Sequence, residues 1–246
     1  MIDHDERVEA AGRELAALID AVADGGLAAP VPTCPGWTVG DLALHVGQFC
    51  DRWLQRTRDA TGRAPVPFTK PAPDDPGLVD WLREWGDLLM VDLRTLPPET
   101  EVSTWYEPDQ SAGFVARRSV HELAVHRYDG QSARGTCAPI EPPAVAIDGI
   151  EEMVVTLTTR VRTGYDGGGH TIHLHGTDEG VDGAEWLLTL HGDRVDVARV
   201  HAKGDLALRG SVSDLELLLY GRPTLGTVQR FGDETVLDTW YRIFTF

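Results

Sequence analysis

The sequence predicts a mainly α-helical N-terminal bundle of the four-helix type, residues 1–163, followed by a small α+β domain with an antiparallel sheet, residues 164–246. Segments with apolar residues at helical spacing fill the first part. From about residue 164, short segments of alternating apolar and polar residues, separated by glycine-containing turns, take their place. A run of helices followed by a run of strands is typical of a helical unit joined to an α+β unit.

The first two helices are expected on either side of a stretch rich in glycine and proline. Residues 5–24 carry apolar side chains on one helical stripe, including Leu15 and Leu18. The sequence DGGLAAPVPTCPGW then interrupts the helix. Thr38 followed by Asp41 resembles a capping box, with Asp in place of the usual Glu, and predicts that a second helix begins there.

Three more helices are expected before the boundary. Residues 78–96 form an amphipathic pattern that two prolines end. Residues 111–130 form the fourth pattern, and Gly130 is expected at its C′ position, where helices commonly end. Residues 142–161 are expected to form a fifth helix.

The second part is expected to contain four short antiparallel strands and two helices. Ser211 and Asp214 resemble another capping box, which opens the first of these helices. The strands are expected at residues 171–176, 185–192, 194–201 and 206–210, and the helices at residues 212–221 and 234–244.

Charge and cysteine content narrow the class of protein. Asp and Glu number 39 against 22 Lys and Arg, a formal net charge of −17, which argues against nucleic acid and anionic membranes as partners. The N-terminal MIDHDERVEA is polar and no apolar run reaches the length of a membrane span, so we expect a cytoplasmic protein without a signal peptide. The cysteines Cys34, Cys50 and Cys137 include no CxxC pair, which favours a reduced compartment over a disulfide framework.

The stretch SVHELAVHRYDG carries a candidate pair of metal ligands. Glu122 and His126 are four residues apart and share one helical face, whereas His121 lies roughly 100° around the helix from Glu122. His45 on the second helix is a candidate third ligand, because antiparallel bundles build metal sites between facing helices. Spacing alone leaves open that these are ordinary polar residues. Asp129 either orients the His126 ring or is a polar residue at the helix end.

Three segments, in order along nearly the whole chain, carry a family resemblance. They are CPGWTVGDLALHVGQF, RRSVHELAVHRYDG and LALRGSVSDLELLLYGRP. They resemble, in turn, the W-T-V-x-D-L-x-x-H helix, the R-x-x-x-E-x-x-x-H-R-x-D helix and the C-terminal strand and helix of the mycothiol-dependent maleylpyruvate isomerase family. The resemblance implies a DinB-like N-terminal bundle, in which a Glu is the third metal ligand where many DinB-like relatives have a His.

The resemblance also implies a site and a reaction. His45, Glu122 and His126 are implied as ligands of a divalent metal, with Zn²⁺ expected, and mycothiol is implied as the thiol cofactor. A metal-bound thiol is deprotonated and nucleophilic. It would add to the cis double bond of an enone acid, the resulting single bond would rotate, and elimination would give the trans isomer. Arg222, in LLLYGRP, is implied to bind the substrate carboxylate; its alternative is a helix-terminal arginine that neutralises the dipole.

The expected protein is therefore a mycothiol-dependent isomerase that binds a small-molecule thiol and an electrophilic substrate, as a monomer or homodimer. Two alternatives stay open. One is a mycothiol S-transferase acting on another electrophile, and the other is a non-catalytic metal-dependent binding or regulatory module. The fold and the metal site do not separate these functions.

Two remaining groups of side chains are given plainer interpretations. His173 and His175 would share one face of a strand, as metal ligands can. With no carboxylate or third histidine evident nearby, a solvated strand face is the preferred interpretation. Cys34 is interpreted as a small apolar residue where a helix begins, because nothing basic adjoins it to lower its pKa.

Overall fold

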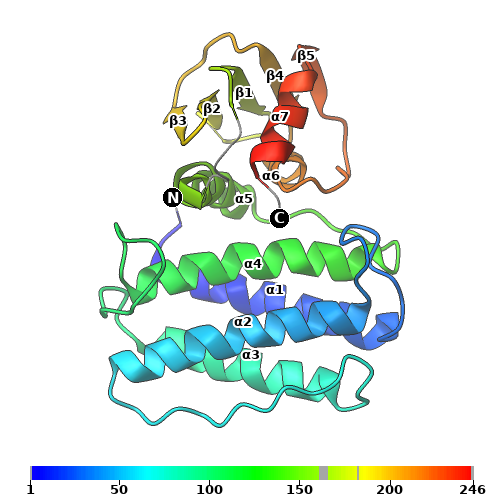
Figure 1. Ribbon diagram of the computed structural model, residues 1–246, viewed down its shortest axis with the longest axis vertical. Helices are drawn as coiled ribbons and strands as arrows, with labels where there is room; N and C mark the ends of the chain where they lie inside the picture. Colours follow the sequence, from blue (N-terminus) through cyan, green and yellow to red (C-terminus); the bar gives the residue numbers. More distant parts are fainter. Residues whose placement is uncertain (1, 161–165, 182, 245–246) are drawn as a thin grey trace. The chain divides into compact units, whose positions relative to one another are not determined.

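The computed structural model describes residues 2–160, 166–181 and 183–244 (Figure 1). Their backbone divides into two compact units, residues 2–138 and the segment from Pro139 to the C-terminal end. The boundary that the sequence analysis expects between residues 163 and 164 lies outside the described residues. Each unit has its own buried apolar core, so each is described by itself.

The first unit is the four-helix bundle that the sequence predicts. Helix α1 packs against α4 and α3, and helix α2 packs against α3 and α4. Leu15 and Leu18 of the expected apolar stripe are buried. Among the described residues, no helix is both long enough and apolar enough to cross a membrane. The helices are α1 (His4–Gly25), α2 (Val39–Ala60), α3 (Leu78–Thr95) and α4 (Ala112–Ser132) (Figure 1).

A capping box fixes where α2 begins, as the sequence predicts. The Asp41 N–H donates a hydrogen bond to Thr38 Oγ1 (3.2 Å), and the Thr38 N–H donates one to Asp41 Oδ2 (2.9 Å). These bonds satisfy two N–H groups that the first helical turn would otherwise leave without partners. Because the start of the helix is fixed, the direction of His45, one turn further on, is fixed with it.

The prediction that Gly130 ends α4 is wrong. The helix continues to Ser132, and the glycine with positive φ that follows is Gly135 (φ 66°). At Gly130 a Cβ would lie 3.3 Å from the Ala21 Cβ and 3.5 Å from a Leu18 methyl. The glycine therefore serves the close approach of α4 to α1, a role that looks the same as a helix end when only the local sequence is read.

Helix α5 (Pro143–Glu151) belongs to the second unit, although the sequence analysis counts it with the bundle. It packs on α6 (Val212–Leu219). The Ile140 N–H just before it donates a hydrogen bond to Ser213 Oγ (2.8 Å), a partner 73 residues away. Contacts at such separation are not visible in a local pattern, which explains the different assignment.

The regular helix also ends earlier than expected. A π-helical turn (Glu152–Thr156) and a 3-10 turn (Leu157–Arg160) follow α5. This stretch is rich in β-branched residues, and the Thr158 hydroxyl donates a hydrogen bond to the Val154 carbonyl oxygen (2.6 Å). β-branching and hydroxyl bonds of this kind both weaken the regular α-helical pattern.

The second unit contains a five-stranded sheet in the order β3–β2–β1–β4–β5. Three neighbouring pairs are antiparallel as expected, and β1 with β4 is parallel, so the sheet is mixed. Strand β5 was not anticipated, because its exposed residues QRFG show no alternation. Helix α7 (Thr235–Ile243) forms where the sequence predicts it. The strands are β1 (Thr171–Gly176), β2 (Glu185–Leu190), β3 (Val195–Ala198), β4 (Leu206–Gly210) and β5 (Gln229–Gly232).

Candidate metal centre

Three side chains of types that bind metals, those of His45, Glu122 and His126, lie together between α2 and α4. His45 Nε2 lies 3.0 Å from Glu122 Oε1, and His126 Nε2 lies 3.5 Å from the same oxygen. One donor atom from each residue lies within 4.8 Å of the other two. His121 is fully buried on the same helix and is not part of this group, in agreement with its helical position. The structure therefore brings together two imidazoles and one carboxylate.

Arg118 holds the second oxygen of the Glu122 carboxylate. Its Nη2 donates a hydrogen bond to Glu122 Oε2 (2.8 Å), one turn away on the same helix. Burial raises the pKa of Glu122, but the charge of Arg118 and the hydrogen bonds with His126 and His45 outweigh it and hold that pKa well below its usual range. Glu122 is therefore an anion at neutral pH, as a metal ligand must be.

Asp129 orients the His126 ring. Its fully buried carboxylate accepts a hydrogen bond from His126 Nδ1 at 2.9 Å, which leaves Nε2 facing Glu122. Burial lowers the pKa of His126, but the hydrogen bonds with Asp129 and Glu122 outweigh it and raise the pKa to about 9. The two carboxylates that stabilise a proton on this ring would likewise stabilise a cation held between the donors. The role of an orienting partner, left open in the sequence analysis, is therefore the one that this geometry favours.

We expect Asp129→Asn to weaken divalent-metal affinity about 10- to 100-fold, because the amide cannot fix the ring tautomer or supply negative charge. The measurement is competition for Zn²⁺ between the full-length protein and a chromophoric chelator. Asp20→Asn, which changes an exposed carboxylate on α1, is the matched control and should leave affinity unchanged. An Asp129→Asn protein that binds metal as tightly as its parent would contradict this role.

An open pocket lies beside His45, one of the three donors. It has a volume of about 390 Å³ and is lined in part by Trp37, His45, Gln48 and Lys70. The Trp37 ring centroid lies 5.1 Å from that of His45 and 6.4 Å, in a stacked arrangement, from that of His126. Sequence patterns alone assign Trp37 no role at the site, although its position just before the capped start of the helix that carries His45 is a usable signal. The pocket is large enough for part of a small-molecule ligand.

Cys50 and Cys137 offer no activated nucleophile at this centre. None of Cys34, Cys50 and Cys137 forms a disulfide in the structure. Burial and the nearby charges of Glu122 and Asp51 raise the pKa of the Cys50 thiol to about 12. Burial also raises the pKa of Cys137. Both groups therefore stay protonated at neutral pH, and a protonated thiol is a poor nucleophile.

Arg222 lies in the second unit, just after α6. Its guanidinium is buried, and Nη1 donates a hydrogen bond to the Tyr220 carbonyl oxygen (2.8 Å). This places it at the end of a short helix, where a cation is favourable. Its role in substrate binding stays a prediction.

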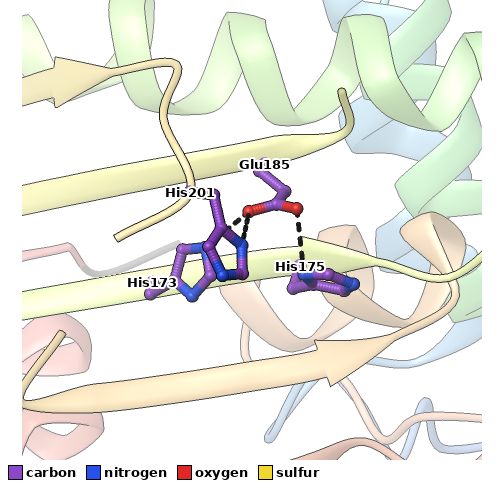
Figure 2. A group of neighbouring side chains, drawn as sticks. All are labelled: His173, His175, Glu185 and His201. Carbon is purple, nitrogen blue, oxygen red and sulfur yellow. Dashed lines mark hydrogen bonds and ion pairs between the residues drawn. The ribbon is translucent and has the colours of Figure 1, made fainter. Parts of the chain in front are cut away.

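The interpretation of His173 and His175 as a solvated strand face is wrong. His173 is buried, and a carboxylate and a third histidine, Glu185 and His201, lie beside the pair (Figure 2). Glu185 stands opposite His175 in the antiparallel pairing of β1 with β2. The pairing of β1 with β2 is the signal that could have revealed Glu185. That pairing depends on the register of the two strands, which cannot be read from either segment alone.

Both the sequence and the structure are similar to those of known proteins. A family model described as the mycothiol maleylpyruvate isomerase N-terminal domain matches residues 8–130, which include all three candidate ligands of the bundle. No curated protein matches the sequence. Among solved structures, the chain is similar to the crystal structure of the mycothiol-dependent maleylpyruvate isomerase (TM-score 0.63) and to that of a histidine-to-alanine mutant (TM-score 0.64). Each is 16% identical, and each match covers 93% of both chains, so the likeness of fold extends through both units.

Proposed function

Since this chain belongs to the mycothiol-dependent maleylpyruvate isomerase family, we propose that it is a metal- and thiol-dependent enzyme acting on a small electrophilic acid. The expected reaction is cis–trans isomerisation of an enone acid with mycothiol as the thiol. The observation that carries the proposal is the meeting of His45, Glu122 and His126, with His45 in the wall of an open pocket. Membership of the family supports this activity. The solved relatives are only 16% identical, so the activity itself is tested by the experiments that follow.

The three donors fit a divalent metal, and Zn²⁺ suits them. Two imidazole nitrogens and one carboxylate oxygen are a donor set of catalytic zinc sites, which keep a position open for a ligand. The dication and the Glu122 carboxylate together leave one net positive charge. The neighbouring charges of Arg118 and Asp129 cancel, so the site as a whole favours an incoming anion. When bound there, such an ion would lower the pKa of a small-molecule thiol and so supply a thiolate.

The residues of the chain hold and orient these groups. Arg118 fixes the carboxylate of Glu122, and Asp129 fixes the tautomer and direction of His126. The Trp37 ring lies beside both imidazole rings and gives that side of the site an apolar surface. Lys70 and Asp41 both line the pocket, so its wall carries charges of both signs. The protein therefore contributes positioning and electrostatics, while the thiol supplies the nucleophile that makes the double bond single and free to rotate.

One experiment distinguishes the candidate activities. The zinc-loaded protein is incubated with maleylpyruvate or a generic electrophile, with and without mycothiol, and both the product and the remaining free thiol are measured. An isomerase converts the cis acid and leaves the thiol concentration unchanged, whereas a transferase consumes one thiol per turnover. We expect isomerisation without thiol consumption. A metal-loaded protein that turns over no substrate with any thiol would contradict the proposal and favour a binding module.

We expect Arg222→Lys to reduce kcat/KM for an acidic substrate about 10- to 100-fold, because lysine keeps the charge but loses the planar fork that pairs two carboxylate oxygens. Metal content should not change. Arg209→Lys, at an exposed position of β4, is the matched control. Because Arg222 is buried, the melting temperature of each variant is measured as well. If folded Arg222→Lys and Arg222→Ala proteins both keep the parental KM and kcat, the proposed role is wrong.

A further inference from the structure

The second unit carries a group of four side chains that all can bind metal: His173, His175, Glu185 and His201 (Figure 2). The Glu185 carboxylate is at its centre. Its Oε2 lies 3.0 Å from His173 Nε2 and 2.6 Å from His201 Nδ1, and its Oε1 lies 3.1 Å from His175 Nδ1. One donor atom from each of the four lies within 4.8 Å of the others.

The sheet itself explains why three of these side chains meet. His173 and His175 are two residues apart on β1 and therefore share a face. The antiparallel register pairs His175 with Glu185 of β2, which places the carboxylate on that same face. The neighbouring positions Ile172 and Leu174 point the other way and are fully buried. The three polar side chains thus occupy the face opposite the apolar core.

The order of the strands explains why the fourth side chain, that of His201, lies beside the other three. Strand β3 lies at one edge of the sheet, and β4 lies on the far side of β1, so residues 199–205 must pass back across β2 and β1. This segment runs close to β1: a Cβ at Gly204 would lie 2.9 Å from the His173 backbone nitrogen. His201 is carried on it, and its ring centroid lies 5.4 Å from that of His173 and 6.0 Å from that of His175.

Charge distinguishes this group from an ordinary hydrogen-bonded cluster. Carboxylate oxygens and imidazole nitrogens are the donors that Zn²⁺ takes in proteins. The hydrogen-bond and ion-pair partners of Glu185 are histidines alone among the described residues, with no Lys or Arg to balance its charge. The three rings are nearly perpendicular to one another, at 75–89°, so their nitrogens converge from different directions. Converging donors around a carboxylate that no Lys or Arg neutralises suit a cation.

We propose that His173, His175, Glu185 and His201 bind one Zn²⁺-type divalent ion as a closed, structural four-ligand site. Three imidazole nitrogens and one carboxylate oxygen fill a tetrahedral shell, which leaves no open position for chemistry. Ligand atoms around tetrahedral zinc are about 3.4 Å apart, whereas the four donors lie within 4.8 Å of one another. The widest pair therefore has to close by about 1.4 Å at most and the closest pairs have to separate slightly, mainly through the exposed side chain of His201 (77% exposed). The ion would tie the segment 199–205 to β1 and β2.

This site is tested by titrating zinc into the full-length, metal-free protein in the presence of a chromophoric chelator that competes for the ion. We expect about two equivalents of zinc per chain, one at each centre. In a Glu122→Ala background, which isolates the second centre, His201→Ala should remove the remaining equivalent. Zinc should also raise the melting temperature of Glu122→Ala but not of Glu122→Ala/His201→Ala. Because His201 is exposed, its replacement should not disturb folding of the metal-free protein.

His170→Ala is the matched control, since it changes an exposed histidine just before β1 that lies outside the group and should leave zinc binding unchanged. The double variant His175→Ala/His201→Ala guards against residual binding by three ligands. Retention of two equivalents in that double variant would overturn the proposal, and so would a parent protein that binds a single equivalent lost with Glu122→Ala. The equivalent lost with Glu122→Ala tests the bundle centre separately, so the two sites succeed or fail independently.

Discussion

Alanine at His45, Glu122 or His126 will remove the divalent ion from the bundle and abolish thiol-dependent turnover. A centre with three protein ligands has none to spare. Loss of a partner that only orients a ligand already costs about 10- to 100-fold in metal affinity or activity, so loss of a ligand itself should exceed that range. The measurement is zinc content by mass spectrometry together with turnover, and each variant should lose one equivalent of zinc.

His121→Ala is the control for these variants. It lies next to Glu122 on the same helix, is fully buried and is not part of the donor group. It should keep its zinc, even if the loss of a buried ring lowers the melting temperature. Full retention of zinc by all three ligand variants would show that the metal, if any, binds elsewhere in the chain.

Turnover will require an added small-molecule thiol and will survive replacement of all three cysteines. The pKa of Cys50 is raised to about 12 and that of Cys137 is also raised. Neutral pH lies below both pKa values, so both thiols stay protonated. A protein carrying Cys34→Ser, Cys50→Ala and Cys137→Ser should therefore keep most of its mycothiol-dependent rate. Without thiol, the rate of the parent should fall to the uncatalysed background.

Two further measurements sharpen this result. Mycothiol should support a higher rate than glutathione, because a sugar-bearing thiol requires a pocket of its own. Activity should also persist below the pH at which the free thiol ionises, since a metal-bound thiol has a lowered pKa. Equal turnover with and without thiol would contradict the mechanism and favour a hydrolase that uses metal-bound hydroxide at the same centre.

Much of the bundle could be predicted because its signals are local. Helical periodicity marks α1 to α4, and the capping box at Thr38 and Asp41 locates the start of α2. Gly130 shows the limit of such signals, because a glycine required for close packing of two helices has the same local appearance as one that ends a helix. The grouping of α5 with α6 depends on contacts far apart in sequence, which periodicity does not encode.

The two histidine-containing groups also differ in how far local sequence patterns could predict them. Glu122 and His126 could be paired from helix geometry, since residues four apart share a face whatever the rest of the fold does. His45 was a candidate third ligand because antiparallel bundles build metal sites between facing helices, and the family resemblance then implied it as a ligand. The group around Glu185 required the register of β1 with β2 and the path of the chain from β3 to β4. Neither the register nor the path can be read from a single segment, so Glu185 and His201 were not predicted as members of that group.

The unequal exposure of the bundle ligands has a consequence for metal exchange. Glu122 and His126 are 19% and 11% exposed and stand on a helix buried on most sides, whereas His45 is 39% exposed and faces the pocket. A bound ion would therefore leave by way of His45, through rotation of one side chain and not through opening of the bundle. Side-chain rotations are far faster than local unfolding. The metal carried by the protein would then follow the ions that the cell supplies at a given moment, and not the ion present when the chain folded.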